Sequence, residues 1–328
     1  MHKPQSADKF TPMFGTALFN DASLQLAHNG TLALFAALTP LERFGLAGLL
    51  GLVFGSFLSV VVYRTPIMLQ RAWERELRTL NASSSMTAAP SDDAPSDAPL
   101  DAQARFNLCL PGSSCTVCGH RLRVWENLPL ISFILLRGKC AACRTPIGWI
   151  YPLLEALSAV VAILMLWRYG ASAQTLAGFA LAATLLALGF IDARTGLLPD
   201  AITLPLLWAG LLLNLGTVFA TPESAILGAV CGYASLWAVY WLFKLATGKE
   251  GMGYGDFKLF AALGAWLGWQ ALPQILLIAA VAGAVAGIAA LCLGRLQRDQ
   301  PLPFGPFLAG AAILVMIGDG LANPWLGV

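Results

Sequence analysis

Long apolar stretches with almost no charged residues recur along most of the chain. They run over residues 44–63, 149–167, 175–191, 201–219, 224–245, 256–269, 271–293 and 304–321. About 20 apolar residues are enough for a helix to cross the hydrocarbon core of a bilayer. The pattern therefore predicts an all-α polytopic membrane protein of about eight transmembrane helices. One further apolar stretch, 31–39, is too short to cross and is expected to lie at the membrane interface.

Composition supports this fold class. Of the 328 residues, 57% are hydrophobic and 12% are charged, whereas soluble domains carry about 25% charged residues. We expect membrane lipid around the helices and no nucleic-acid partner. The first 43 residues contain no pattern of a cleavable signal, because no small-residue cleavage site follows a compact apolar core. They are expected to form a periplasmic or interfacial segment.

The distribution of basic residues predicts the orientation. Of the 20 Lys and Arg residues, 16 fall on one side of the expected spans, and only Lys3, Lys9, Arg43 and Arg168 fall on the other. Because loops that remain in the cytoplasm carry the excess of Lys and Arg, the richer side is cytoplasmic. Both termini are then expected to lie outside the cytoplasm, and the large loop 64–148 is expected to lie within it.

The large loop has two parts of different character. Residues 81–104 consist mainly of Ser, Ala, Pro and Asp. Such a composition cannot bury a core, so this part is expected to be a disordered linker. The rest of 64–148 contains the cysteines, and residues 149–328 are expected to form a seven-helix membrane domain.

Two CxxC pairs lie in the second part of the loop, Cys115 with Cys118 and Cys140 with Cys143. The 21 intervening residues give the spacing of a zinc ribbon, in which each pair offers two thiolates to one tetrahedral ion. Two disulfides are the competing interpretation, which the cytoplasmic location disfavours because thiols there stay reduced. We therefore expect a small zinc-ribbon-like domain with a closed, structural Zn²⁺ site.

Four carboxylates lie near the cytoplasmic ends of the expected spans: Glu155, Asp192, Asp200 and Asp256. Ionisable residues at such depth are costly and therefore point to function. Capping of a helix N-terminus is the favoured alternative for Asp200 and remains open for Asp256. Glu155 has alternatives too, pairing with an arginine or orienting a backbone group. Capping does not explain Asp192, because it ends its span, where the helix dipole disfavours a carboxylate.

At these residues the sequence resembles the type IV prepilin peptidase family. The segment GYGD at 253–256, followed by FKL and by GAWLG at 264–268, resembles the GxGD segment of that family. Asp192 with the downstream LPD at 198–200 is similar to its first aspartate motif, and GSFLSVVVYR at 55–64 to its first-span signature. Pro129 and the two CxxC pairs resemble its cytoplasmic domain. The resemblance covers residues 44 to 320.

The resemblance implies an aspartic endopeptidase of the bacterial inner membrane, with Asp192 and Asp256 as its catalytic pair. Its substrates would be type IV prepilins and the pseudopilins of type II secretion, whose basic leaders are removed after a glycine at the cytoplasmic face. Members with four cysteines also methylate the new N-terminus with S-adenosylmethionine. For that second activity, Gly138 and Lys139 beside Cys140 are the nearest candidates, although a turn of the metal site explains them equally well.

Two other functions compete with this interpretation. A GxGD protease that acts on other transmembrane substrates would share the aspartates, but the cysteine pairs and the first-span signature favour the prepilin interpretation. A transporter would use membrane carboxylates to bind protons or cations, and it would show internal repeats of the span pattern. No convincing repeat is present in the sequence.

Overall fold

The computed structural model describes residues 37–85, 106–110, 112–249, 251–294 and 302–318. Residues 31–36 of the expected interfacial stretch 31–39 and residues 86–104 of the expected linker 81–104 lie outside the described residues. Residues 81–85 are the end of a helix, so the expected disorder is wrong for this part of the linker. The chain divides into two compact units, residues 1–46 and 47–328. The cysteines, both pockets described below and the helices from residue 47 onward belong to the second unit.

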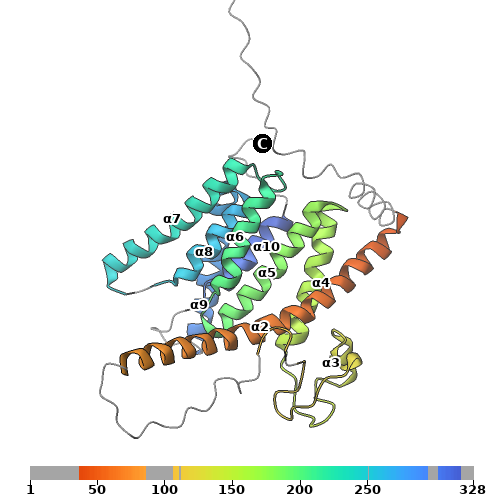
Figure 1. Cartoon of the computed structure of the whole chain (residues 1–328). Helices are drawn as coiled ribbons and strands as arrows, with labels where there is room; N and C mark the ends of the chain where they lie inside the picture. The colour runs from red at the N-terminus through yellow and green to blue at the C-terminus, as the bar shows by residue number, and fades with distance from the viewer. Residues whose placement is uncertain (1–36, 86–105, 111, 250, 295–301, 319–328) are drawn as a thin grey trace, which may run out of the picture. The chain divides into compact units, whose positions relative to one another are not determined.

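A helix occupies each of the predicted spans (Figure 1). These helices are α2 (Pro40–Ser85), α4 (Ile150–Tyr169), α5 (Ala173–Thr195), α6 (Asp200–Asn214), α7 (Pro222–Thr247), α8 (Tyr254–Leu267), α9 (Leu272–Cys292) and α10 (Gly305–Ile317). Shorter elements connect them: η2 (Val124–Asn127), α3 (Ile131–Leu135) and η3 (Trp269–Ala271). The described residues form no β-strand, only two isolated bridges beside the cysteine pairs. The all-helical fold class is therefore confirmed.

The helices differ in whether they are long enough to cross a membrane. Five of them, α2, α4, α5, α7 and α9, have the necessary length and apolar character. The helices α6, α8 and α10 have 15, 14 and 13 residues. At about 1.5 Å per residue they are shorter than a hydrocarbon core of about 30 Å.

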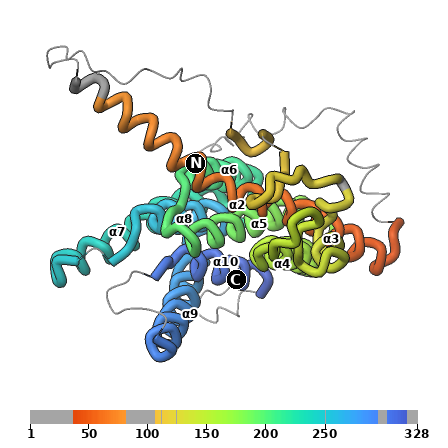
Figure 2. The backbone as a smooth tube through the Cα atoms, turned by 90° about the horizontal axis from the view of Figure 1, so that it is seen from below, coloured from red at the N-terminus to blue at the C-terminus, as the bar shows by residue number. Residues whose placement is uncertain are grey.

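Helix α2 continues far beyond its predicted span, because the helix does not end where the apolar stretch ends. It has 46 residues and ends at Ser85 rather than at residue 63. After Pro66 the sequence contains no proline or glycine before Ser85, and it is rich in Leu, Arg and Glu, which are good helix formers. Figures 1 and 2 show this later half of α2 passing the ends of α5 and α6.

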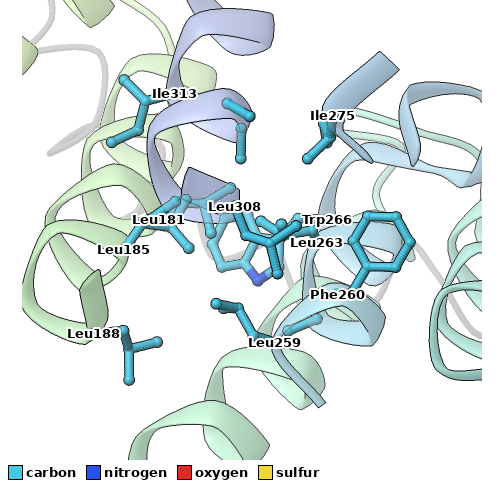
Figure 3. Packing of buried hydrophobic residues seen from close by; sticks show 14 of the residues in the cluster. Leu181, Leu185, Leu188, Leu259, Phe260, Leu263, Trp266, Ile275, Leu308 and Ile313 are labelled. Carbon is cyan, nitrogen blue, oxygen red and sulfur yellow. The ribbon is translucent and has the colours of Figure 1, made fainter. Parts of the chain in front are cut away.

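Helix α8 lies at the centre of the bundle and packs against α6, α7, α9 and α10. Ten of its residues are buried, from Asp256 to Trp266. Leu259, Phe260 and Leu263 belong to the same buried core as the leucines of α5 and α10, which Figure 3 shows. A helix that is apolar on every side is one that other helices surround. Its neighbours shield α8 from lipid, which explains why a short helix suffices there.

Two glycines bring α7 and α8 into backbone contact. A Cβ on Gly264 would overlap the Gly228 carbonyl oxygen, and a Cβ on Gly228 would overlap that of Gly264. Small residues allow such close approach between membrane helices. Gly264 opens the GAWLG segment, so this part of the motif serves helix packing.

Asn214 joins the ends of two helices. Its buried side-chain amide donates to the carbonyl oxygens of Ala265 and Trp266, at 2.8 Å each, and so satisfies the C-terminal end of α8. Its carbonyl oxygen accepts from the backbone amides of Phe219 and Ala220. One side chain thereby fixes α8 to α6 and to the loop that leads into α7.

The outer faces of the long helices are apolar. On α9, Leu277, Val281, Val285 and Ile288 are each more than half exposed and follow one another at helical spacing. A soluble monomer rarely exposes a continuous apolar face of this kind. Lipid contact explains the stripe, in agreement with the predicted polytopic membrane protein.

Candidate functional site

Asp192 lies in the last turn of α5, and its side chain is buried, with the residue only 5% exposed. Its Oδ2 accepts a hydrogen bond of 2.9 Å from the backbone N–H of Gly305, the first residue of α10. The positive end of the α10 dipole therefore offsets the unfavourable end of the α5 dipole. This contact explains how a carboxylate is held at the end of its own helix, because a second helix keeps it in place.

Asp256 lies in the first turn of α8 and is 7% exposed. Its Oδ1 is buried and has no hydrogen-bond partner among the described atoms. Asp192 and Asp256 line the same pocket. Two acids that are 64 positions apart in the sequence are thus brought together, each near the N-terminus of a helix. An unpartnered buried carboxylate oxygen is costly unless a ligand or water completes it.

A pocket of about 440 Å³ opens over the two aspartates. The loop before α6, the glycine segment before α8 and α2 line it, and its lining includes Leu69, Trp73, Leu198, Tyr254 and Gly255 in addition to the acids. Gly255 is needed for packing, because a Cβ there would lie 2.7 Å from the Leu198 Cβ. The pocket is large enough for a short extended peptide segment beside the carboxylates.

Asp200 and Lys258 form an ion pair at this pocket. Lys258 Nζ donates to both carboxylate oxygens of Asp200 at 2.7 Å. The capping interpretation of Asp200 is wrong, since Pro199 occupies the N-cap of α6 and no side chain caps this helix. A lysine in the second turn of α8 reaches the carboxylate across the pocket, and no local pattern in the sequence indicates that approach.

The four cysteines of the CxxC pairs converge. Their Sγ atoms all lie within 4.8 Å of one another, with 3.8 Å between Cys115 and Cys143 and 4.0 Å between Cys118 and Cys140. Four sulfurs at about 2.3 Å from a central zinc ion are about 3.8 Å apart, whereas a disulfide requires about 2.05 Å. All four are free cysteines. The residues therefore fit a tetrathiolate metal site, and the disulfide alternative is wrong.

The two cysteine pairs adopt the same local fold. Cys115 and Cys140 each donate a backbone N–H to the carbonyl oxygen five residues later, at 2.9 Å. In each turn a residue with positive φ follows the second cysteine, Gly119 at 71° and Arg144 at 58°. The Thr145 hydroxyl and backbone N–H lower the pKa of the Cys143 thiol to about 6. A thiolate is the form that binds metal, so this turn is suited to a ligand.

Gly138 and Lys139 belong to the second cysteine turn. Gly138 has a φ of 68°, and a Cβ there would lie 3.0 Å from the Phe133 ring. Lys139 forms the isolated bridge with Pro146, and the residue is exposed. Neither residue lines the aspartate pocket or the second pocket, which lies between α2, α4 and the cysteine domain.

Glu155 does not reach the aspartates. It lies on α4, is 9% exposed and accepts a 2.8 Å hydrogen bond from the Leu130 backbone N–H. It therefore orients a backbone group, one of the two alternatives that the sequence offered. It lines a different pocket, between α2, α4 and the cysteine domain.

The main site residue that the sequence did not reveal is Gly305, which holds Asp192. It is 113 positions away from that aspartate in the chain. The only local signal is a glycine followed by Pro306 at the start of an apolar stretch. Such a pair is common at helix N-termini and does not indicate a carboxylate partner.

Two family models match the chain. The first, described as the bacterial peptidase A24 N-terminal domain, matches residues 49–169. The second, described as the type IV leader peptidase family, matches residues 179–288. Together they contain α4, the cysteine cluster and both aspartates.

Curated relatives match over most of their length. A protein of Burkholderia pseudomallei (strain 1026b) named prepilin leader peptidase/N-methyltransferase is 54% identical over 288 residues, 87% of this chain and 89% of the relative. A protein of Pseudomonas putida with the same name is 50% identical and covers 88% of this chain and 96% of the relative. One of Pseudomonas aeruginosa, also of that name, is 47% identical over 85% and 91%. No solved structure matches the chain.

Proposed function

Because the chain belongs to the type IV leader peptidase family, we propose that it is an intramembrane aspartic endopeptidase that removes the leaders of type IV prepilins. The observation that carries this proposal is the pair of buried carboxylates, Asp192 and Asp256, at one pocket. The relatives named prepilin leader peptidase/N-methyltransferase supply the substrate class. Pseudopilins of type II secretion, whose leaders are similar, belong to the same proposal.

The two aspartates perform acid–base catalysis as a unit. Two carboxylates at close range do not both ionise easily, so the pair holds one proton. The ionised member takes a proton from a water molecule, which attacks the scissile carbonyl carbon. The protonated member donates to the developing oxyanion and then assists departure of the amine. The pair titrates together, so neither Asp192 nor Asp256 has a fixed role.

Helix ends position the acids for this work. The N–H of Gly305 fixes Asp192 Oδ2, while Asp256 Oδ1 has no partner among the described atoms and can bind the water. Activation of a water molecule requires one carboxylate that is held in a fixed orientation and a second carboxylate oxygen that is available to bind the water.

The pocket suits a substrate that is itself an apolar helix with a basic leader. Leu69 and Trp73 of α2 provide an apolar wall of the aspartate pocket. The scissile bond, which follows a glycine in this substrate class, would enter between that wall and Asp256. Lys and Arg residues of the leader would remain in the cytoplasm.

The placement in the membrane is part of the proposal. All eight helices cross or enter the bacterial inner membrane, both termini lie outside the cytoplasm, and the aspartates face it. The excess of Lys and Arg in the loops that flank the aspartates supports this orientation.

The second activity would be N-methylation of the new N-terminus with S-adenosylmethionine. The printed name of the relatives, prepilin leader peptidase/N-methyltransferase, supports it. The cysteine cluster would hold Zn²⁺, which when bound cross-links the two turns of this domain. Cys115, Cys118, Cys140 and Cys143 would be its ligands.

The test replaces each aspartate by asparagine, which keeps the size and removes the charge. Purified Asp192→Asn and Asp256→Asn are incubated with a prepilin in detergent or liposomes, and the product is weighed by mass spectrometry. We expect neither variant to cleave, while Glu223→Gln, an exposed carboxylate in the first turn of α7, cleaves as the wild type does. Substantial cleavage by either asparagine variant refutes the two-aspartate mechanism.

A further inference from the structure

A second pocket, of about 490 Å³, lies between α2, α4 and the cysteine domain. Its lining is mixed: apolar and aromatic side chains from α2, α4 and the segment 133–147 alternate with hydroxyls and carboxylates. It shares no lining residue with the aspartate pocket. The volume is within the range of pockets that bind small molecules of nucleotide size.

Glu155 is the unusual group in this pocket. It is buried, yet the hydrogen bond that its carboxylate accepts comes from a neutral group, the Leu130 N–H at 2.8 Å, and the hydroxyl-bearing Ser56 lines the same pocket. A buried carboxylate is normally paired with a cation. The other buried carboxylate in the lining, Glu126, does have an ionisable partner, since it lies 3.1 Å from His120 Nε2. Glu155 thus has no cation in hydrogen-bond contact among the described residues, and a cationic ligand in the pocket would supply one.

The rest of the lining offers complementary groups. The rings of Tyr63, Phe133 and Tyr151 line the pocket and provide surfaces on which a purine can stack. The Phe106 ring lies in the same lining, with the Arg71 guanidinium 4.3 Å from its centroid. Arg64 is 8% exposed, and its Nη1 donates to the Asn107 carbonyl oxygen at 2.9 Å. That contact fixes a guanidinium in the wall, where its charge favours a ligand carboxylate.

Helix α2 connects this pocket with the aspartates. Arg64 is the last α2 residue that lines the second pocket, and Leu69 is the first that lines the aspartate pocket. Five residues of helix correspond to about 7.5 Å. The linings of the two pockets therefore follow each other along one helix, which places the second pocket next to the site where a new N-terminus is released.

We propose that the second pocket binds S-adenosylmethionine, with Glu155 facing its sulfonium cation and the ring cluster holding its adenine. This ligand combines a purine, a carboxylate and a permanent positive charge, which are the three features that the lining complements. The proposal rests on the methylation part of the proposed function and assigns that activity a place which Gly138 and Lys139 do not line.

The reaction at this place is a single displacement. The new α-ammonium group first loses a proton to solvent, and the nitrogen lone pair then attacks the methyl carbon. One C–N bond forms as the C–S bond breaks, and its electron pair returns to sulfur, giving S-adenosylhomocysteine and a methylated ammonium group. Glu155 takes no part in the bond changes and acts as a positioning residue.

The experiment measures binding rather than turnover. Calorimetric titration of the purified full-length protein in detergent compares S-adenosylmethionine with S-adenosylhomocysteine, which lacks the sulfonium charge. In Glu155→Gln the amide oxygen can still accept from Leu130. In this variant we expect the Kd for S-adenosylmethionine to rise about tenfold or more. The Kd for S-adenosylhomocysteine should change less than about threefold. The matched control, Glu223→Gln, should change neither.

A purely structural role for Glu155 would weaken both ligands equally, and that result would overturn the assignment. A second variant, Tyr63→Leu, removes a stacking face without altering charge and should weaken both ligands; this variant decides the outcome if Glu155→Gln does not fold. Unchanged affinities in both variants would also refute the assignment of S-adenosylmethionine to this pocket. Loss of binding in Lys139→Ala alone would refute it as well.

Prepilin cleavage is measured on the same samples to separate the two proposals. Glu155→Gln should retain it. A wild-type protein that cleaves but binds no S-adenosylmethionine would remove the pocket assignment and leave the peptidase in place. A wild-type protein that binds S-adenosylmethionine but cleaves no prepilin would refute the peptidase proposal and leave the pocket assignment in place.

Discussion

Asp192 illustrates how far single residues could be understood before the structure was known. The sequence places this carboxylate at the end of its own helix, where the helix dipole disfavours it and capping does not explain it. The structure supplies the group that holds it in place, the N–H of Gly305 at 2.9 Å. No property of the sequence near either residue specifies the contact, because it depends on how α10 enters the bundle. The acids themselves were predictable, while their supports were not.

Gly305 should be essential for cleavage because it has no room for a side chain. A Cβ at this position would lie 2.7 Å from Asp192 Oδ2, so Gly305→Ala must displace the carboxylate or the start of α10. A displacement of about 1 Å in a catalytic group can cost about 10²-fold in rate. We expect kcat/KM for prepilin cleavage to fall by about that factor in the purified variant.

The same helix provides the control. A Cβ on Gly310 would have no neighbouring atom within 4 Å, so Gly310→Ala should cleave at the wild-type rate. If Gly305→Ala retains full activity, the contact with Asp192 is not what positions the carboxylate. If both variants lose activity, a general effect on α10 explains the loss.

At the scale of elements, the position of each helix followed from hydropathy, but the length of α2 and the central place of α8 did not. The apolar stretch in α2 ends near Arg64, whereas good helix formers carry the helix on to Ser85. A hydropathy pattern reports where a helix is apolar and not where it ends. The burial of α8 arises from contacts with four other helices, which a single stretch of sequence cannot reveal.

Asn214 should be one of the largest single contributors to the stability of the bundle. Its replacement by alanine would leave two carbonyl oxygens of α8 and the N–H groups of Phe219 and Ala220 without their partner. Unsatisfied buried groups cost about 1–3 kcal/mol each, less where water can reach them. We expect Asn214→Ala to lower the free energy of unfolding by about 2–4 kcal/mol, measured by denaturant or thermal unfolding in detergent.

Gln174→Ala is the comparison for Asn214→Ala. Gln174 also donates an amide hydrogen to a backbone carbonyl, that of Val218, but the bond is exposed. Surface changes of this kind usually stay within about 0.5 kcal/mol. Similar losses in the two variants would contradict the idea that burial makes the Asn214 bonds important.

The cysteine domain should depend on its metal for its fold, whereas the membrane helices should not. Cys140→Ser removes one of the four converging thiols, and a structural site with three ligands binds zinc weakly. Elemental analysis should find about one zinc per wild-type chain and almost none in the variant. The matched control is Cys109→Ser, because Cys109 is exposed and lies outside the cluster.

Retention of zinc by Cys140→Ser, or its loss from Cys109→Ser, would contradict the ligand set. Prepilin cleavage on the same samples tests the independence of the two parts. Because the aspartate pocket has no lining residue from the cysteine turns, cleavage should persist without metal.

For the molecule as a whole, the strongest prediction from sequence was its membrane character, and the exposed apolar faces of α7 and α9 agree with it. The predicted orientation depends on the distribution of 20 basic residues and on nothing that the helix packing reveals. It therefore needs an experiment on the protein in its native membrane.

The two ends of α5 provide that experiment. Ala171 precedes this helix and Thr195 is its last residue, and both are exposed. In a background with Cys109, Cys231 and Cys292 replaced by serine, a membrane-impermeant maleimide should label Ala171→Cys in intact cells. Thr195→Cys should react only after the membrane is permeabilised, since the aspartate end of α5 faces the cytoplasm. The reverse pattern would place the aspartates on the outer face, where a leader that stays in the cytoplasm could not reach them.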